Sequence, residues 1–356
     1  MSLSDDEYSE IEVTEELARV LDAPLDHALA TPSLDNLNFG SKEYCDVYRT
    51  ILRQKTWENT EPKIVPYPWQ LDVALAIHLG RDVFLIAGTG FGKTLPFVMN
   101  CWVNKTLIVW IISPLNALAN QQVRTFTKWN IRAVAVNSTT TYSGIYKDIL
   151  AGKYQVVISS IEAFTDTTRL LPIIQSEELA RQRKHVAIMD EAHCIVKWGK
   201  LFRPRYAVAG DMRLVLPGHT PYVAATATAN QATREGIKHV LRLSDDLLPV
   251  HLGNHRENLA YSVHRLKKGK SSISELLGYY PDKTRRLPRF SLIFVDNRPL
   301  GQLALSLLRQ DMLPQLRYKA QIYHAFRSDN VKEILAAGFE TEDGFSDLVC
   351  TESLTM

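Results

Sequence analysis

The chain has 356 residues, which is enough for about two domains that each bury a core. Hydrophobic content of 46% is that of an ordinary globular protein, and the longest apolar run, Leu107–Ile112, is too short to span a membrane. The net charge of +2 excludes a strongly basic chain, so a nucleic-acid surface requires local clustering of basic residues. The N-terminus is acidic and polar, unlike a secretory signal, and the cysteines lack C-x-x-C spacing. We therefore expect a soluble intracellular protein without a zinc site or disulfides; its cysteines are Cys45, Cys101, Cys194 and Cys350.

Residues 1–58 are predicted to form an acidic N-terminal extension with one or two short helices. Over residues 59–248, short apolar runs alternate with amphipathic stretches, a pattern typical of buried parallel strands joined by helices. This predicts an α/β fold with a parallel sheet covered by helices on both faces. The predicted strands are Val83–Ala87, Leu107–Ile112, Gln155–Ser160, Val186–Asp190 and Tyr222–Thr228.

One helix is predicted over Pro114–Trp129, where apolar residues recur every three or four positions. Ser113 is expected to cap it and Pro114 to be its first residue.

A connector is predicted over residues 249–270, and it ends in a basic cluster, Lys267, Lys268 and Lys270. A second, smaller α/β unit is predicted over residues 271–356. Only about 85 residues belong to it, which is small for a complete α/β domain. Its expected elements are the strands Ser291–Val295, Gln321–Ala325 and Leu348–Thr351 and the helix Leu300–Arg309.

A glycine-rich segment, AGTGFGKT (Ala87–Thr94), stands between a predicted strand and a helical stretch. In that context, backbone N–H groups and a helix N-terminus bind phosphate. Lys93 is expected to reach the β- and γ-phosphates and Thr94 to hold Mg²⁺, while Gln70 upstream would read the adenine edge. The alternative is a glycine-rich turn without a ligand. The nucleotide-binding residues expected besides Gln70 are Gly88, Thr89, Gly90, Phe91, Gly92, Lys93 and Thr94.

An acidic pair, Asp190-Glu191, follows the predicted strand VAIMD. Ligands in open α/β sheets collect at the carboxyl ends of strands, where the glycine-rich segment is also expected. Asp190 would bind the metal through water and Glu191 would activate the attacking water, with Lys93 completing the predicted catalytic set. The alternative is an exposed acidic pair that caps a helix.

Aromatic and basic residues alternate after the acidic pair. Aromatic faces and cations together suit single-stranded bases and phosphates. A core-packing loop with a solvated basic rim has the same composition, so both interpretations stay open. The aromatic and basic residues are Lys197, Trp198, Lys200, Phe202, Arg203, Arg205 and Tyr206. Weaker candidates for phosphate contact, all in positions that also cap helices, are Ser113, Asn116, Gln121, Ser159, Ser160 and Glu162.

Four segments resemble, in order, the motifs of superfamily 2 helicases: AGTGFGKT, SPLNALANQQ, DEAHCIVKWGKLFRPRY and ATAT. AHCIVKWGKLFRPRY is similar to the aromatic-rich loop that separates RecQ-type DNA helicases from RNA helicases with the same DEAH letters. YPWQ resembles the family's adenine motif, and NHRENLAYSV resembles its linker. SLIFVDNRPLGQLALSLLR and IYHA resemble the opening motifs of its second lobe. The resemblance covers about residues 60–356, and residues 190–206 are its most specific part.

This resemblance implies a RecA-like first domain followed by an incomplete second RecA-like domain, with ATP and Mg²⁺ as cofactors. It implies an ATP-dependent 3′→5′ DNA helicase that acts on single-stranded and duplex DNA, in DNA recombination or repair in the nucleus. Lys200 and Leu201 depart from the histidine and aspartate that the family usually has there. The residues that the resemblance implies in DNA coupling are His193, Trp198, Phe202, Arg203, Tyr206, Thr226 and Thr228.

The final segment, LVCTESLTM (Leu348–Met356), resembles the start of a family motif, and the arginine-bearing motif expected after it is not in the chain. An arginine on the transferred phosphate is worth roughly 10³–10⁵ in rate, so weak hydrolysis is expected. The main alternative is therefore a helicase-like protein that binds ATP and DNA without productive unwinding. An RNA helicase or another nucleic-acid-stimulated ATPase is disfavoured by the WGKLFRPRY segment.

Overall fold

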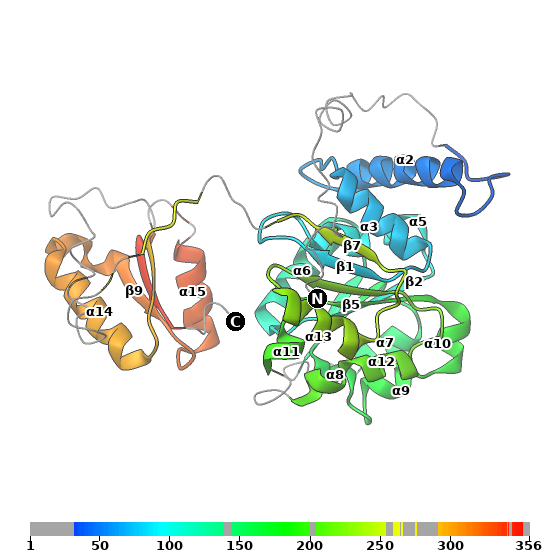
Figure 1. Ribbon diagram of the computed structural model, residues 1–356. Coiled ribbons are helices and arrows are strands. Elements are labelled where there is room, and N and C mark those ends of the chain that lie inside the picture. The colour runs from blue at the N-terminus through cyan, green and yellow to red at the C-terminus, as the bar shows by residue number, and fades with distance from the viewer. Residues whose placement is uncertain are drawn as a thin grey trace, which may run out of the picture. The chain divides into compact units, whose positions relative to one another are not determined.

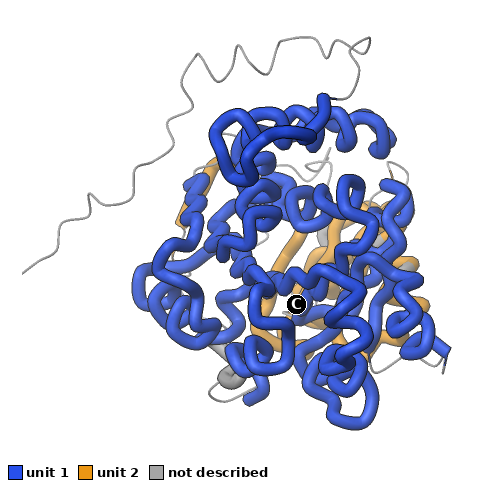
Figure 2. Tube along the Cα trace, turned by 90° about the vertical axis from the view of Figure 1, so that its right-hand side faces the viewer, with its two compact units in different colours: residues 1–256 blue, residues 257–356 orange. Residues whose placement is uncertain are grey.

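A computed structural model describes residues 32–137, 144–198, 204–253, 259–263, 265, 275, 291–339, 341 and 344–351. The chain divides into two compact units, residues 1–256 and 257–356 (Figure 2). Each unit is considered by itself. No helix within the described ranges is both long and apolar enough to cross a membrane.

The first unit is built on a seven-stranded parallel sheet with the order β3-β4-β2-β5-β6-β1-β7 (Figure 1). All five strands expected for this region are present within a residue or two of their predicted bounds. The two strands that the sequence did not predict, β3 and β7, lie at the two edges of the sheet, and most of their residues are only partly buried. The strands are β1 (Val83–Ile86), β2 (Leu107–Ile112), β3 (Ala133–Val136), β4 (Val156–Ser159), β5 (Lys184–Met189), β6 (Tyr222–Thr226) and β7 (Leu248–His251).

Helices cover both faces of this sheet, because successive strand residues point to opposite faces. Val109 and Ile111 of β2 pack into one core cluster with Phe126, whereas Ile108 and Trp110 pack into the other. The predicted α/β fold is confirmed. The helices are α2 (Lys42–Asn59), α3 (Pro68–His78), α4 (Thr94–Val98), α5 (Asn100–Val103), α6 (Asn116–Lys128), α7 (Ile145–Leu150), α8 (Ile161–Phe164), α9 (Leu170–Ile174), α10 (Glu177–Gln182), α11 (Cys194–Trp198), α12 (Met212–Val215), α13 (Gln231–Leu241) and the 3₁₀ helix η2 (Pro204–Asp211).

Three local features differ from the sequence-based expectations. Helix α2 falls at the end of the expected acidic extension, yet Tyr48 and Leu52 on it are fully buried in the first core cluster. Helix α6 begins at Asn116 after Leu115, which has no side-chain cap, so the prediction of Ser113 as its cap is wrong. Strand β7 ends at His251, so its last three residues lie within the predicted connector of residues 249–270.

The second unit contains a three-stranded parallel sheet with the order β8-β10-β9. Helix α14 starts after Asn297, whose side chain accepts a hydrogen bond from the N–H group of Leu300. It packs on the sheet through a small core that includes Leu308 and Val349. The three predicted strands and the predicted helix are present, and one further helix, α15, was not predicted. The elements are β8 (Ser291–Phe294), α14 (Arg298–Asp311), the 3₁₀ helix η5 (Pro314–Lys319), β9 (Ala320–Tyr323), α15 (Asp329–Phe339) and β10 (Asp347–Cys350).

Candidate functional site

The motifs of the first unit meet at the carboxyl edge of its sheet. The glycine-rich loop follows β1, the pair Asp190-Glu191 follows β5, and Thr226 ends β6. These three strands are parallel neighbours in the order β5-β6-β1, so their carboxyl ends lie side by side. This edge is where open α/β sheets bind ligands.

The glycine-rich loop is closed by its own lysine. Lys93 Nζ donates to the carbonyl oxygens of Ala87 at 2.8 Å and Gly88 at 3.2 Å. Gly92 has a φ of 80°, in the left-handed region, and a Cβ placed there would lie 2.8 Å from Nε2 of Gln70. The loop therefore requires glycine at this position for both conformation and space.

Gln70 joins α3 to the loop. Its side chain is buried, its Nε2 donates to the carbonyl oxygen of Gly92 at 3.0 Å, and its Oε1 accepts from the N–H group of Tyr67 at 2.8 Å. An amide nitrogen has two hydrogens, so one donor remains for a ligand. Gln70 thus holds the loop in place as well as facing the space beside it.

A cavity of about 420 Å³ lies beside the loop, between α3 and α6. Its size is that of a small-molecule site, and its apolar wall suits a flat ring. The half-exposed ring of Tyr67 lies at this cavity. The residues that line it are Ile64, Val65, Tyr67, Gln70, Gly90, Phe91, Gly92, Thr94, Leu95, Leu118, Gln121, Gln122, Thr125 and Trp129.

Asp190 is buried and has two hydrogen-bond donors. Its Oδ1 accepts from the N–H group of Glu191 at 3.0 Å, and its Oδ2 accepts from Nε2 of Gln122 at 3.0 Å. Burial and the neighbouring charge of Glu191 raise the pKa of Asp190 to about 6, although Gln122 and the charge of Lys93 oppose this. The ionised form of Asp190 is therefore destabilised by its surroundings in the folded protein.

Gln122 was not predicted as a site residue, whereas its neighbour Gln121 was, and both line the cavity. The sequence did contain a signal. Gln122 lies three residues after Ala119 and four before Phe126, both buried, so it is a polar residue on the buried face of α6. Such a residue requires a polar partner inside the protein.

Glu191 adopts a left-handed φ of 48°, which is uncommon for a residue other than glycine. Its Oε2 lies 3.2 Å from Nδ1 of His193, and the same Nδ1 lies 3.0 Å from the Thr226 hydroxyl. Thr226 donates in turn to the carbonyl oxygen of Thr228 at 3.2 Å. Burial alone would raise the pKa of Glu191, but the hydrogen bond and charge of His193 and the charge of Lys93 lower it overall. An unbroken polar chain thus links Glu191 to the segment after β6.

The aromatic segment gives a mixed result. Tyr206 lies in η2 with 0% of its surface exposed, inside the second core cluster, so the prediction that its ring stacks on bases is wrong. Trp198 ends α11, but its side chain, like Lys200, Phe202 and Arg203, lies outside the described residues.

Two weaker phosphate-contact candidates have structural roles. Ser160 caps α8 by accepting from the N–H group of Ala163 at 3.2 Å. Ser113 is buried and donates within its own turn to Leu115 O at 3.5 Å.

Two oxygen-bearing side chains at this edge, Thr94 and Asp190, were expected to hold Mg²⁺. Within the described ranges, no three His, Cys, Asp or Glu side chains cluster closely enough to hold a metal by themselves. Mg²⁺ is usually bound by one or two carboxylates together with substrate phosphates and waters. A hydroxyl and a single buried carboxylate beside a phosphate loop fit a metal that arrives with a nucleotide.

Residues 67–235 match the DEAD/DEAH box helicase family. The ATP-dependent DNA helicase RecQ of Pasteurella multocida (strain Pm70) is 30% identical over 282 residues, which are 75% of this chain and 42% of that relative. In its helicase domain, the chain belongs to the RecQ type. The ATP-dependent helicase wrn-1 of Caenorhabditis elegans is 27% identical to it over 81% of this chain and 26% of the relative. The ATP-dependent helicase SGS1 of Saccharomyces cerevisiae is 33% identical over 59% of this chain and 14% of the relative. The chain thus spans less than half the length of these relatives.

Solved helicase structures share the fold of this RecQ-type chain. The DUF1998 helicase MrfA bound to DNA superposes with a TM-score of 0.63 over 86% of this chain and 44% of its own, at 14% identity. Dbp5 of S. cerevisiae, bound to RNA and ADP BeF3, superposes with a TM-score of 0.57 over 81% of this chain and 74% of its own, at 16% identity. These likenesses show a RecA-like helicase fold.

Proposed function

We propose that this protein is an ATP-dependent DNA helicase that moves 3′→5′ along single-stranded DNA and unwinds duplexes. The RecQ-type helicase domain supports ATP use and DNA as the polynucleotide. The polarity follows from the resemblance to RecQ-type helicases. Action in nuclear recombination or repair belongs to the same proposal.

One observation carries the proposal: the chain of contacts from Glu191 through His193 to Thr226. It connects a carboxylate beside the glycine-rich loop to the segment after β6 through contacts of 3.2 and 3.0 Å. A site that only bound nucleotide would not need this connection. A site that couples hydrolysis to movement on a strand needs one, because a shift of either end changes the position of the other.

Nucleotide binding is assigned to the loop and to the cavity beside it. Lys93 would exchange its two carbonyl acceptors for the β- and γ-phosphates, and the backbone N–H groups of the loop would bind phosphate oxygens. Gln70 has one amide hydrogen left for the edge of the base, and Tyr67 offers an exposed ring beside it. Thr94 and Asp190 would hold Mg²⁺, which neutralises charge on the phosphates when bound.

Hydrolysis is assigned to Glu191. A carboxylate whose pKa is lowered stays ionised at neutral pH and accepts a hydrogen bond from water, which orients the water toward the terminal phosphate. The left-handed backbone of Glu191 is held by the hydrogen bond from the N–H group of Ala192 to Ala225 O at 2.9 Å. Strained backbone held by its surroundings is characteristic of functional sites. DNA sensing is assigned to Trp198, Phe202 and Arg203.

The test is steady-state ATP hydrolysis with and without single-stranded DNA, followed by strand displacement on duplexes with a 3′ or a 5′ single-stranded tail. We expect single-stranded DNA to bind and to stimulate the weak hydrolysis predicted from the sequence only slightly, and any unwinding to occur on the 3′-tailed duplex alone. Equal stimulation by RNA would contradict the assignment of DNA. ATP binding without turnover would favour the alternative of a nucleotide- and DNA-binding protein without productive unwinding.

Lys93→Ala is expected to weaken ATP binding at least about tenfold, because the variant lacks charge-assisted hydrogen bonds to the phosphates. Isothermal titration with ATP and Mg²⁺ measures this. Lys147→Ala is the matched control, since Lys147 is an exposed lysine on α7 away from the loop. Equal ATP affinities for wild type and Lys93→Ala would show that the loop does not bind nucleotide.

Glu191→Gln is expected to lower DNA-stimulated turnover by about 10²–10⁴, the usual contribution of a general base, while ATP binding stays near that of the wild type. The change keeps the size of the side chain and removes its charge. Glu177→Gln, at a position with 83% of its side chain exposed, is the control and should leave turnover unchanged. A turnover in Glu191→Gln within a few-fold of wild type would remove Glu191 from the mechanism.

A further inference from the structure

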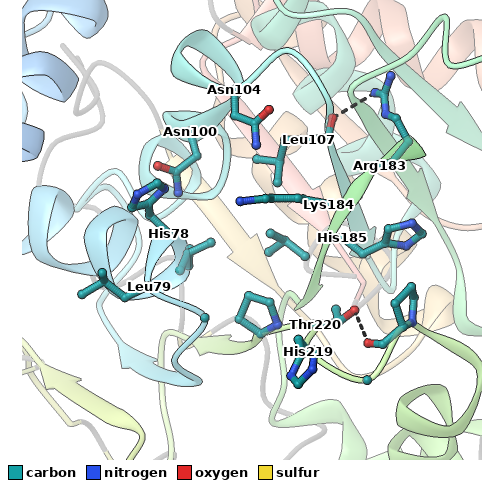
Figure 3. Close-up of a pocket in the computed structure, with 16 residues that line it drawn as sticks. His78, Leu79, Asn100, Asn104, Leu107, Arg183, Lys184, His185, His219 and Thr220 are labelled. Carbon is teal, nitrogen blue, oxygen red and sulfur yellow. Dashed lines mark hydrogen bonds between the residues drawn. The ribbon is translucent and has the colours of Figure 1, made fainter. Parts of the chain in front are cut away.

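A second cavity lies at the opposite, amino edge of the seven-stranded sheet. It is bounded by the starts of β2 and β5, by the turn before β6 and by the end of α3 (Figure 3). Lys184 begins β5 and Asp190 directly follows it, so at about 3.3 Å per residue the two lie about 20 Å apart. This amino-edge pocket is therefore separate from the proposed ATP site.

The amino-edge pocket has a volume of about 340 Å³, and none of its lining residues is Asp or Glu. Two of them, Arg183 and Lys184, carry positive charge. Protein surfaces usually mix charges of both signs, so a concave site with only cations favours an anion. The lining residues are Ile77, His78, Leu79, Gly80, Asn100, Asn104, Leu107, Arg183, Lys184, His185, Val186, Pro217, Gly218, His219, Thr220 and Pro221.

Arg183 supplies a stationary charge. Its Nη2 donates to the carbonyl oxygens of Leu107 at 3.0 Å and Tyr154 at 2.9 Å, and its Nη1 donates to Gly152 O at 3.2 Å. These bonds fix the guanidinium group and use several of its donors. Carbonyl acceptors carry no net charge, and no carboxylate among the described residues pairs with Arg183, so its positive charge is not neutralised by them.

Lys184 supplies an available donor. Its backbone N–H group donates to Thr106 O at 3.2 Å, which fixes the start of its side chain. The side chain extends across the cavity toward His78 and Asn100 (Figure 3). Its ammonium group makes no hydrogen bond or ion pair with any residue in the part of the chain that the structure describes.

Asn104 and His219 add polar groups to the lining of the cavity. Asn104 Oδ1 accepts from both the N–H group and the hydroxyl of Thr106, at 2.9 and 2.8 Å. These bonds fix the amide, whose Nδ2 has no acceptor among the described residues. His219 is exposed on a turn that Thr220 closes with two hydrogen bonds to Pro217 O.

Two other histidines form the wall and contribute no charge at neutral pH. His78 Nε2 lies 2.7 Å from the Tyr44 hydroxyl, and the ring stacks on Tyr48 with centroids 3.9 Å apart. His185 Nδ1 accepts from Nε1 of Trp110 at 3.2 Å. Burial lowers the pKa of both histidines to about 4, and the charge of Lys184 adds to the effect at His78. The charge of the pocket therefore comes from Arg183 and Lys184.

We propose that the amino-edge pocket binds a small organic phosphate, with Lys184, Asn104 and His219 donating to its phosphate and hydroxyl oxygens from different parts of the lining. The volume is at the lower end of the range for small-molecule sites, which suits a single sugar phosphate and excludes a folded partner. Leu79, Leu107 and Pro217 give the cavity an apolar side against which the organic part packs. This inference does not depend on the helicase activity proposed for the opposite edge.

The experiment is isothermal titration with ribose 5-phosphate, which has a phosphate group but no base. The protein is the full chain with Lys93→Ala, so that the glycine-rich loop does not contribute. We expect binding to this protein, and an affinity at least about tenfold lower when Lys184→Gln and His219→Gln are added. Lys147→Gln in the same background should leave the affinity unchanged.

The proposal would be overturned if ribose 5-phosphate did not bind the Lys93→Ala protein, or if its affinity were unchanged after Lys184→Gln and His219→Gln. Binding of a ten-nucleotide single strand at this pocket in place of ribose 5-phosphate would also overturn it. A separate titration distinguishes this site from the ATP site. In a chain with Lys93 intact, Lys184→Gln with His219→Gln should leave ATP affinity unchanged. Both residues are exposed, so the pair of substitutions should also leave the urea unfolding transition unchanged.

Discussion

Asp190→Asn should make the protein more stable and abolish its ATP turnover. In the folded protein without nucleotide or metal, the Asp190 carboxylate is buried beside the like charge of Glu191, and its pKa rises from 3.8 to about 6. At about 1.4 kcal/mol per pKa unit, the ionised form costs about 3 kcal/mol at pH 7.5. Asparagine removes that cost and removes the predicted metal ligand with it.

The hydrogen bonds at this position can be remade in the variant. Asparagine keeps an oxygen for the N–H group of Glu191 and presents an NH₂ group where Asp190 accepted from Gln122. The Oε1 of Gln122 is buried without a hydrogen-bond partner among the described residues, so a flip of the Gln122 amide provides the acceptor. The flip places the Gln122 NH₂ group where its oxygen now lies buried without a partner among the described residues, so one unsatisfied polar group replaces another.

The pH dependence of the stability difference between Asp190→Asn and wild type tests whether the buried carboxylate causes it. A group whose pKa is raised by folding costs no stability below its unfolded pKa, and its cost grows as pH rises toward the folded pKa. The advantage of Asp190→Asn should therefore fall from about 3 kcal/mol at pH 7.5 to about 1 kcal/mol near pH 4.5. Urea unfolding with a metal chelator present measures it. All six tryptophans lie within residues 1–256, so their fluorescence reports the first unit.

Glu177→Gln is the control for Asp190→Asn, because Glu177 is exposed and its replacement should change the free energy of unfolding by less than about 0.5 kcal/mol. An Asp190→Asn variant that is less stable than wild type at pH 7.5, or an advantage that does not depend on pH, would mean that the buried carboxylate is not the source of the cost.

Asp82→Ala should lower the free energy of unfolding of the first unit by about 3–5 kcal/mol. Asp82 is buried where β1 begins and accepts hydrogen bonds from the N–H groups of Tyr222 at 2.8 Å and Ser244 at 2.9 Å. It also pairs with Arg213, whose guanidinium group lies 4.0 Å from the centre of the Tyr222 ring. Alanine leaves a half-buried cation and two backbone donors without their acceptor.

The matched control for Asp82 is Asp211→Ala. Asp211 pairs with Arg242 at 2.9 Å, and both side chains are 53% exposed. Solvent-exposed ion pairs contribute little, so this variant should lose less than about 1 kcal/mol. Tryptophan fluorescence in urea compares the two variants. Similar losses for both would show that burial of the Asp82–Arg213 pair does not decide its contribution.

Local pattern was sufficient for most of the sheet. The strands VFLIA, LIVWII and VAIMD are continuous apolar runs that bury both faces, and such runs are visible without tertiary information. The edge strands β3 and β7 were missed because edge residues pack on one side only, and their burial depends on which strand lies beside them. The start of α6 was misplaced because Leu115, which has no capping side chain, precedes its first residue.

Some residues of the candidate site could likewise be predicted from local sequence, and others could not. The identity of Lys93, Asp190 and Glu191 as site residues follows from residue types next to strand ends, although their roles remain predictions. Tyr206 was misassigned because an aromatic residue among cations has the same composition whether it faces bases or a core, and only packing against the second core cluster decides between them. Gln122 contacts Asp190 across 68 residues of sequence, a distance over which no local pattern acts.

By itself, the sequence determined the α/β architecture of the first unit, the glycine-rich loop and the RecQ-type resemblance, because hydrophobic period and short motifs are local properties of the chain. Tertiary structure alone decided which side chains meet, Gln122 with Asp190 and His193 with Thr226, and that Lys184 and His219 line one cavity. These contacts come from the order in which the parallel strands pair. That order brings distant strand ends together at both edges of one sheet.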